Sequence, residues 1–300
     1  MIEISNITKK FDDFTAIEDL SFNVGDCSIY GLVGYNGAGK TTLLKIIAGV
    51  YRQDGGTVKI DGVDTLKNPH IKEEMFYVPD DLYFEIGATM ESMAKFYKGY
   101  YPKFCMETFK KLSELFGLNT KKRLFGFSKG MQRQAEMVLA LSSMPKVILL
   151  DECFDGLDPA KRNLTRKLLL DYMAEKQCSV IISSHNLHEL ADMCDHIALI
   201  NGKKIALNCA VDDMNGTRCK FRLIFKEDRD RDDFNAIDGI KNFKKDGKII
   251  TFTVSSKAEQ ARGIINAMSP LMVEEFPLTL EEIFLEEMED TDYDFEEIFS

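Results

Sequence analysis

The feature that most constrains this chain is a glycine-rich loop between a short apolar segment and a helical one. Residues 34–42 match the pattern G-x-x-x-x-G-K-[ST]. Residues 28–33 are apolar and partly β-branched, which predicts a buried strand, and residues 42–48 predict the first turns of a helix. This order of strand, loop and helix is the context in which the pattern binds phosphate; a chance glycine turn before a helix is the alternative.

The predicted phosphate-binding residues are consecutive: Gly34, Tyr35, Asn36, Gly37, Ala38, Gly39, Lys40, Thr41 and Thr42. The three glycines allow positive φ angles and bring backbone N–H groups close to phosphate oxygens. The start of the helix adds unpaired N–H groups and a positive dipole end. Lys40 is expected to reach the β- and γ-phosphates, and the Thr41 hydroxyl is expected to bind Mg²⁺.

Length and composition favour a cytosolic protein with one large and one smaller domain. The chain has 300 residues, and no apolar run approaches the roughly 18 residues that a membrane span needs. Residues 1–5 lack the pattern of a signal peptide. Seven cysteines, an odd number with no C-x-x-C pair, favour reduced thiols over disulfides or a zinc site.

The net charge of −11 comes from one end of the chain. Residues 274–300 hold twelve acidic residues and no basic one, which leaves 37 acidic and 38 basic residues elsewhere. The rest of the protein is therefore nearly neutral, which does not favour binding to nucleic acid.

A β-rich layer is predicted around the phosphate loop. Residues 2–8 and 20–24 alternate between apolar and polar side chains, and residues 57–60 lie between two glycine turns, as in a hairpin. Residues 75–79 read as a strand that ends at a proline.

A helical insertion is predicted over about residues 86–141. Ile86, Met90, Met93 and Tyr97 have helical spacing, and a second helix with Phe109, Leu112, Leu115 and Phe116 ends at Gly117. Core packing explains most stripes of this kind. A partner-binding surface is the alternative, because Met and aromatic residues are enriched at adaptable interfaces.

Two buried parallel strands are predicted after the insertion. Residues 145–150 form a continuous apolar run that ends in Asp151 and Glu152, and residues 179–184 form another that ends before His185. A helix is expected between them, over residues 159–175. Together with the phosphate loop, this order predicts a doubly wound α/β sheet that binds a nucleotide.

A small α+β domain is predicted after the sheet, over residues 211–300. Phe221, Leu223 and Phe225 alternate, as do Ile250, Phe252 and Val254, and residues 256–268 favour a helix. Residues 279–282 form a capping box that would open an acidic helix running through Leu285 and Met288.

Six motifs in this order resemble those of the ATP-binding subunit of an ABC transporter, over about residues 1–208. They are Phe11, residues 77–80 (YVPD), 127–132 (FSKGMQ), 147–152 (VILLDE), 156–158 (GLD) and 183–185 (SSH). The FSKGM motif and residues 278–284 (LTLEEIF) resemble the ATPases of bacterial ABC-2-type exporters, closest to those of acetoin-utilisation or antibiotic-resistance transport. The expected fold is a P-loop NTPase domain over residues 1–210, with an antiparallel β layer and the helical insertion.

The sequence and this resemblance together suggest a role for each motif residue. Asp151 would hold Mg²⁺, and Glu152, which strand alternation should turn the other way, would orient the attacking water. The resemblance implies that His185 contacts the γ-phosphate and that Phe11 stacks on adenine. It also implies that Ser128 and Gly130 close on ATP bound by a second subunit, identical or paralogous, with Asp158 at the seam.

Two departures from the family pattern concern the signature loop and Asp80. Lys129 replaces a glycine and Met131 a glutamine, but Ser128 and Gly130 keep the hydroxyl and backbone N–H groups. Asp80 stands where the family usually has a glutamine that contacts Mg²⁺. A carboxylate can also bind this cation, so Asp80 is an expected metal ligand.

The leading hypothesis is an ATPase that uses ATP and Mg²⁺ to drive transport, in the direction of export. It would work through a separate membrane permease, on the inner face of the cell membrane, without nucleic acid. One alternative is an ABC-type ATPase that acts on ribosomes or DNA, although such proteins usually carry two cassettes or long coiled coils. Another is a regulatory module that binds ATP without hydrolysing it, which the presence of both Glu152 and His185 disfavours.

Overall fold

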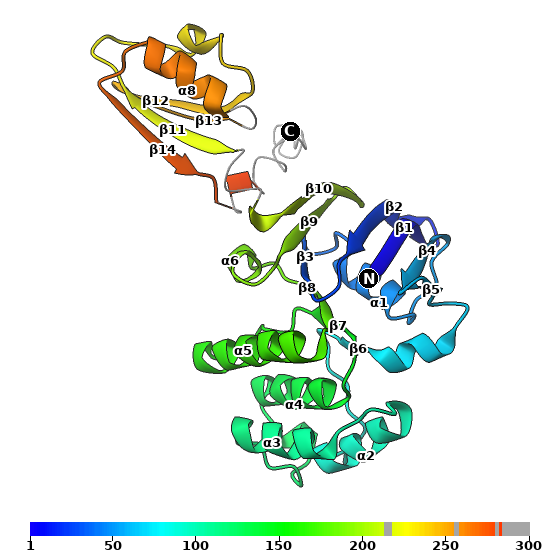
Figure 1. The fold of residues 1–300 in the computed structure, drawn as a ribbon. Helices are drawn as coiled ribbons and strands as arrows, with labels where there is room; N and C mark the ends of the chain where they lie inside the picture. Colours follow the sequence, from blue (N-terminus) through cyan, green and yellow to red (C-terminus); the bar gives the residue numbers. More distant parts are fainter. Residues whose placement is uncertain (213–217, 255–257, 280–281, 284–300) are drawn as a thin grey trace, which may run out of the picture. The chain divides into compact units, whose positions relative to one another are not determined.

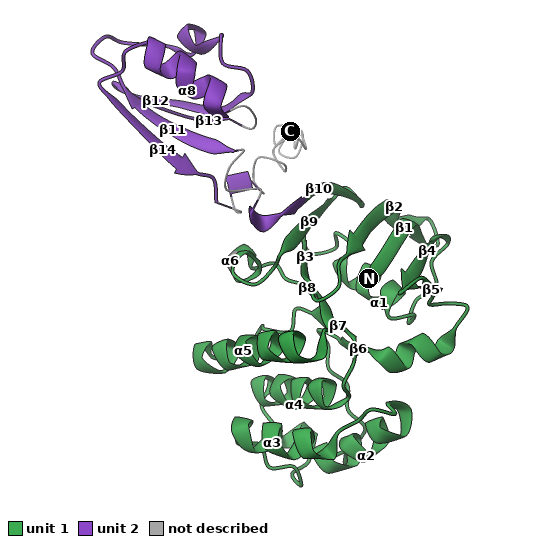
Figure 2. Ribbon diagram, viewed as in Figure 1, with its two compact units in different colours: residues 1–208 green, residues 209–300 purple. Residues whose placement is uncertain are grey.

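The computed structural model of the chain describes residues 1–212, 218–254, 258–279 and 282–283. It divides into two compact units, Met1–Asn208 and Cys209–Ser300 (Figure 2). The boundary predicted from the sequence, between residues 210 and 211, lies two residues further along the chain. Each unit has its own hydrophobic core.

A six-stranded sheet forms the centre of the first unit, in the order β10-β9-β3-β8-β7-β6 (Figure 1). Its strands are β3 (Ile29–Val33), β6 (Met75–Val78), β7 (Val147–Asp151), β8 (Ser179–Ser183), β9 (His196–Asn201) and β10 (Lys204–Ala210). The five strands β9, β3, β8, β7 and β6, which are neighbours in this order, all run parallel. Every residue of β3, β7 and β8 is buried, as their continuous apolar sequences predict.

The second sheet of this unit is antiparallel, in the order β2-β1-β4-β5. It consists of β1 (Ile2–Phe11), β2 (Phe14–Val24), β4 (Gly55–Ile60) and β5 (Val63–Asp64). One hydrophobic cluster joins this sheet, the parallel sheet and helix α1 (Lys40–Ile47), whose Leu43, Leu44, Ile46 and Ile47 are all buried. The phosphate loop before α1 is therefore held between two sheets.

Helices α2 (Met90–Tyr100), α3 (Met106–Phe116) and α4 (Lys129–Ser142) form a separate cluster at one end of this unit (Figure 1). Core packing accounts for Met90, Phe109 and Phe116, which are buried in it. The expectation that Ile86 belongs to the first helical stripe is wrong, because the Thr89 capping box starts α2 later and Gly87 has a φ of 85°. Ile86 is fully exposed.

The carboxyl ends of the parallel strands meet along one edge of the sheet. Asp151, the last residue of β7, pairs with Ser183, the last residue of β8, and Leu32 of β3 pairs with the same serine. Helix α5 (Pro159–Lys176) follows β7, and α6 (Leu187–Ala191) follows β8. Ligands of open α/β sheets bind at this kind of edge.

The second unit is an antiparallel sheet with one helix on its face (Figure 1). Its elements are β11 (Cys219–Ile224), the short 3₁₀ helix Arg231–Phe234, β12 (Ile240–Asp246), β13 (Ile249–Val254), α8 (Ala258–Ala267) and β14 (Met272–Pro277). The alternating Phe221, Leu223, Phe252 and Val254 are buried beneath α8, as their spacing predicts.

The predicted capping box at residues 279–282 is present. The backbone N–H of Thr279 donates to Glu282 at 3.1 Å, and the backbone N–H of Glu282 donates to the Thr279 hydroxyl at 3.2 Å. The acidic helix expected beyond it, including Leu285 and Met288, lies outside the described residues. Within the described part of the chain, no helix combines the length and the apolar character that crossing a membrane requires.

Candidate functional site

The phosphate loop connects β3 to α1, and two of its glycines leave no space for a side chain. A Cβ atom on Gly34 would lie 2.7 Å from the carbonyl oxygen of Ile200, and one on Gly39 would lie 2.9 Å from that of Ala16. Gly39 also has a φ of 105°, which other residues rarely adopt. The two sheets therefore press on the loop from both sides and hold its N–H groups in place.

Lys40 lies over this loop at the first position of α1 and is only 6% exposed. Its Nζ donates to the carbonyl oxygens of Gly34 at 2.7 Å and Tyr35 at 3.3 Å. The same Nζ lies 3.7 Å from Oε1 of Glu152. The ammonium group is thus placed between the phosphate loop and the carboxylate that follows β7.

Asp151 is fully buried and accepts hydrogen bonds from three hydroxyl groups on three elements. Thr41 of α1 and Ser183 of β8 donate to Oδ1 at 3.1 and 2.6 Å, and Tyr77 of β6 donates to Oδ2 at 3.1 Å. Burial and the negative charge of Asp151 raise the pKa of the Tyr77 phenol, so this hydroxyl keeps its proton. Thr41 and Asp151 together offer the hard oxygen ligands that suit Mg²⁺.

Glu152 leaves the sheet in a left-handed conformation. Strand β7 ends at Asp151, and Glu152 has a φ of 47°, so the expected strand alternation does not set its direction. Its backbone N–H donates to the carbonyl oxygen of Ser183 at 3.1 Å. A non-glycine residue in this region costs free energy, which the surrounding packing has to offset.

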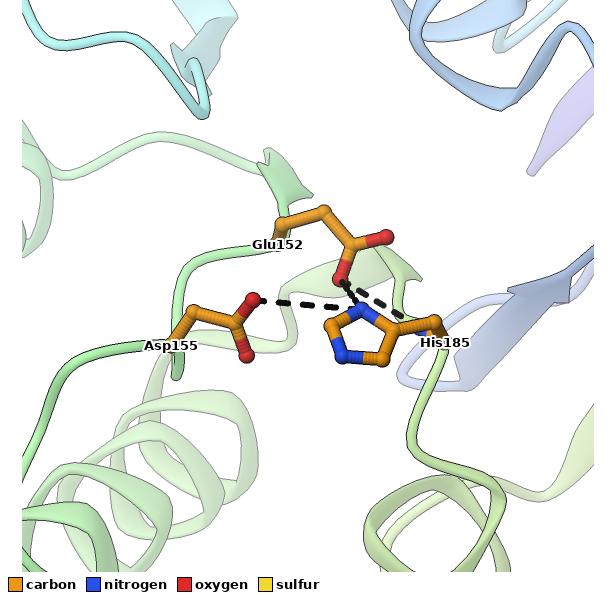
Figure 3. A group of neighbouring side chains, drawn as sticks. All are labelled: Glu152, Asp155 and His185. Atoms are coloured by element: carbon orange, nitrogen blue, oxygen red, sulfur yellow. Dashed lines mark hydrogen bonds and ion pairs between the residues drawn. The ribbon is translucent and has the colours of Figure 1, made fainter. Parts of the chain in front are cut away.

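The carboxylate of Glu152 lies between Lys40 and His185. Its Oε2 is 2.9 Å from Nδ1 of His185 and accepts the backbone N–H of the same residue at 3.3 Å (Figure 3). Oδ2 of Asp155 lies 3.8 Å from the same ring nitrogen. These three side chains offer ligand atoms within 4.8 Å of one another and could hold a cation, but Glu152 and His185 already pair directly.

Lys40, Thr41 and Glu152 border a concavity of about 330 Å³ above the phosphate loop, whereas the predicted residues Asp151 and His185 are not among its lining residues. It is lined by Phe11, Phe14, Ala16, Tyr35, Asn36, Gly37, Gly39, Lys40, Thr41, Thr42, Asp80 and Glu152. Phe11 and Phe14 pair across the β1–β2 hairpin and are 40% and 57% exposed. Two partly exposed rings at the mouth of a polar concavity offer a surface on which a flat base can stack.

Asp80 lies at this concavity but also forms an ion pair away from it. Its Oδ1 is 2.8 Å from Nη2 of Arg133 on α4. The predicted residues Ser128 and Gly130 are not among the lining residues. Ser128 caps α4 by accepting the Met131 N–H at 3.2 Å, and a Cβ on Gly130 would lie 2.8 Å from the carbonyl oxygen of Gly156.

Several side chains that support the site are not predicted from the sequence. Tyr77, Ser183 and Arg133 bind predicted site residues but come from distant parts of the chain. Glu189 of α6 pairs with Arg162 of α5 at 2.6 Å and so ties together the helices that follow the two carboxylates and His185. Tyr77 and Ser183 lie near the carboxyl ends of β6 and β8, within the YVPD and SSH motifs, and this position is the one sequence feature that indicates a role in the site.

Comparisons with known proteins agree with this geometry. Residues 17–155 match the family model described as ABC transporter. The chain is 29% identical to the ABC transporter ATP-binding protein YtrB of Bacillus subtilis, over 95% of this chain and 97% of that protein. It is 30% identical to the lipopolysaccharide export system ATP-binding protein LptB of Haemophilus influenzae, over 73% of this chain and 95% of that protein.

A solved structure shares the fold of the first unit. It is described as a dimeric, post-hydrolysis state of the ATP-binding cassette MJ0796 bound to ADP and Pi, and it matches with a TM-score of 0.62 and 20% identity. The match covers 70% of this chain and 99% of that one. The predicted P-loop NTPase fold is confirmed, and the chain belongs to the ABC transporter family, as an ATP-binding subunit that hydrolyses ATP.

Proposed function

We propose that the concavity binds Mg²⁺ and ATP, with the triphosphate along residues 34–42 and the base against Phe11. The Lys40 ammonium then neutralises charge on the β- and γ-phosphates. Thr41 and Asp151 would hold the cation, which would supply charge neutralisation at the phosphate oxygens. The buried, hydroxyl-bound Asp151 beside Thr41 supports this assignment, because it is a preorganised pair of hard oxygen ligands.

Glu152 is proposed to orient the water that attacks the γ-phosphorus. The water oxygen forms a bond to phosphorus, the bond to the β–γ bridging oxygen breaks, and the water proton passes to Glu152. ADP and inorganic phosphate are the products. His185 holds Glu152 from one side and contacts the γ-phosphate. The single observation that carries this mechanism is the position of Glu152 between Lys40 and His185.

A dimer is proposed because, in the described structure, Ser128 and Gly130 neither line the concavity of their own chain nor hydrogen-bond to a lining residue through their side chains. They differ in this from Asp151 and His185, which bond to Thr41 and Glu152. A second copy, or a paralogous subunit, placed head-to-tail would bring these residues to the γ-phosphate. Asp158, which caps α5 on the exposed surface, would then lie near the seam. The dimeric state named for the similar MJ0796 cassette supports this arrangement.

The membrane permease is proposed to contact an apolar groove beside α2. The groove has a volume of about 560 Å³ and includes Tyr83, Ile86 and Phe96, which are 83%, 102% and 50% exposed. Apolar side chains with this exposure favour a protein interface. Bound there, the chain would lie on the inner face of the membrane. Export, the expected direction of transport, stays a prediction.

The variant Glu152→Gln tests the hydrolytic mechanism. It should bind ATP with unchanged affinity and lose turnover by at least about 100-fold, because only the water-orienting carboxylate is removed. The matched control is Asp155→Asn, which removes the other carboxylate near His185 and should keep most of the activity. A Glu152→Gln protein that hydrolyses ATP at near the wild-type rate would remove Glu152 from the mechanism. A wild-type protein that binds ATP but never hydrolyses it would favour the regulatory alternative.

Co-purification from membranes tests the permease contact. Ile86→Lys should abolish co-purification with the permease and leave the basal ATPase rate unchanged. Leu115→Lys on α3 is the control, because Leu115 is half exposed but lies outside the groove. If Ile86→Lys and Leu115→Lys lost co-purification with the permease equally, the groove would not be the permease contact. A ribosome or DNA that co-purifies instead of a membrane protein would favour the other alternative.

A further inference from the structure

The ion pair between Asp80 and Arg133 joins the nucleotide concavity to the helical cluster. Asp80 follows β6 by two residues and lines the concavity together with Lys40 and Thr41. Arg133 is in the second turn of α4, and its Nη2 lies 2.8 Å from Oδ1 of Asp80. The two residues are 53 positions apart in the sequence.

The environment of Arg133 makes it depend on Asp80. Its side chain is only 13% exposed, and its Nη1 is buried without a hydrogen-bond partner among the described residues. The guanidinium group is largely but not fully buried, and Asp80 is 51% exposed, so a counter-charge compensates in part for the water that the group has lost. Among the described residues, Asp80 is the acidic side chain that forms an ion pair with it.

The position of α4 makes this pair relevant to ATP hydrolysis. The helix begins directly after Ser128, so Arg133 lies little more than one turn from the residues proposed to act on the second subunit's ATP. Gly130, in the first turn of α4, packs so close to the loop after Glu152 that a Cβ on it would lie 2.8 Å from the carbonyl oxygen of Gly156. The Asp80–Arg133 ion pair therefore connects the loop after β6 to the first two turns of α4.

We propose that Asp80 acts in ATP turnover as a positioning residue through Arg133, and not as a ligand of Mg²⁺. The proposal rests on the function proposed above. In the described structure, the ion pair with Arg133 engages Oδ1 and leaves only Oδ2 free toward the concavity, and part of the carboxylate's charge is already balanced by the guanidinium group. Thr41 and Asp151, whose hydroxyl and carboxylate oxygens lie 3.1 Å apart, would provide the cation with oxygen ligands without Asp80. Arg133 thus replaces Mg²⁺ as the group through which Asp80 connects nucleotide binding to α4.

A double-mutant cycle on the full chain tests this proposal. The variants are Asp80→Asn, Arg133→Gln and the combination, with kcat, KM for ATP and the Mg²⁺ concentration at half-maximal rate as measurements. Each single variant should lower kcat by about 5–10-fold, with KM and the Mg²⁺ midpoint changed less than about 2-fold. The double variant should resemble either single one, because both remove the same interaction. Asp80→Glu, which keeps the charge, should restore most of kcat.

Asp81→Asn is the matched control, because Asp81 is the next residue and forms no ion pair among the described residues. It should keep the wild-type kcat. A several-fold rise of the Mg²⁺ midpoint in Asp80→Asn alone would overturn the proposal in favour of a metal ligand. The proposal would also be overturned if the kcat losses of the two single variants multiplied in the double variant. If Arg133→Gln does not fold, the Mg²⁺ midpoints of Asp80→Asn and Asp80→Glu still distinguish the two roles. Unchanged midpoints support a positioning residue, and a raised midpoint in Asp80→Asn supports a metal ligand. Failure of the proposed function would appear separately, as a wild-type chain without ATPase activity.

Discussion

Glu136 should make the stability of the first unit depend on pH. It is on α4, 5% exposed, and accepts one hydrogen bond, from the Tyr97 hydroxyl to Oε1 at 3.1 Å. Its Oε2 is buried without a hydrogen-bond partner in the described structure. Burial raises the pKa of this carboxyl from 4.5 to about 7, although the Tyr97 hydrogen bond opposes the shift.

The sign and size of the effect follow from proton linkage. Between pH 4.5 and about 7, the folded chain keeps the Glu136 proton and the unfolded chain has lost it. The free energy of unfolding therefore falls as pH rises through this window, by about 1.4 kcal/mol per pH unit. The full effect amounts to roughly 3 kcal/mol and is complete above the folded pKa. Glu136→Gln should thus equal wild type near pH 4.5 and be about 3 kcal/mol more stable at pH 8.

The measurement is urea unfolding followed by circular dichroism, for wild type and Glu136→Gln at pH values from 5 to 8.5. The difference between the two proteins cancels the titration of all other groups. Tyr97→Phe serves as a second variant and should extend the fall to higher pH at the same slope, because the carboxylate loses its hydrogen-bond donor and its folded pKa rises further. A difference between wild type and Glu136→Gln that stays constant from pH 5 to 8.5 would refute the reasoning.

Three further predictions concern the nucleotide site and the domain boundary. Gly39→Ala should weaken ATP binding at least about 10-fold in a calorimetric titration, because its Cβ would meet the Ala16 carbonyl at a φ of 105°; unchanged affinity would mean that the loop shifts freely. Tyr77→Phe should raise the Mg²⁺ midpoint of hydrolysis several-fold, because it removes a hydrogen bond that holds the buried Asp151; an equal midpoint would show that the other two hydroxyls suffice. A chain that ends at Ala210 should fold and bind ATP, since it keeps all the site residues and the 2.7 Å hydrogen bond from Tyr30 to Asn208; a folded truncation that does not bind ATP would place part of the site beyond residue 210.

The sequence alone was sufficient for the phosphate loop and the buried strands. The proposed binding of phosphate by residues 34–42 depends on backbone N–H groups and on glycine conformations, both of which are local properties of nine consecutive residues. The apolar runs of β7 and β8 are recognisable in the sequence because a strand that is buried on both faces is apolar at nearly every position. Their recognition does not require knowledge of the neighbouring strands. The order of these elements along the chain then determined the fold class.

The environment of each carboxylate was decided only by the tertiary structure. Asp151 is held by hydroxyl groups of Thr41, Tyr77 and Ser183, which lie 110, 74 and 32 positions away in the sequence. Glu152 takes its direction from a positive φ and not from strand alternation. Asp80, expected at Mg²⁺, is paired with Arg133 because the loop after β6 packs beside α4. Motifs record which groups a site contains, but hydrogen bonds and ion pairs act over a few ångströms, so their partners follow from packing between distant segments.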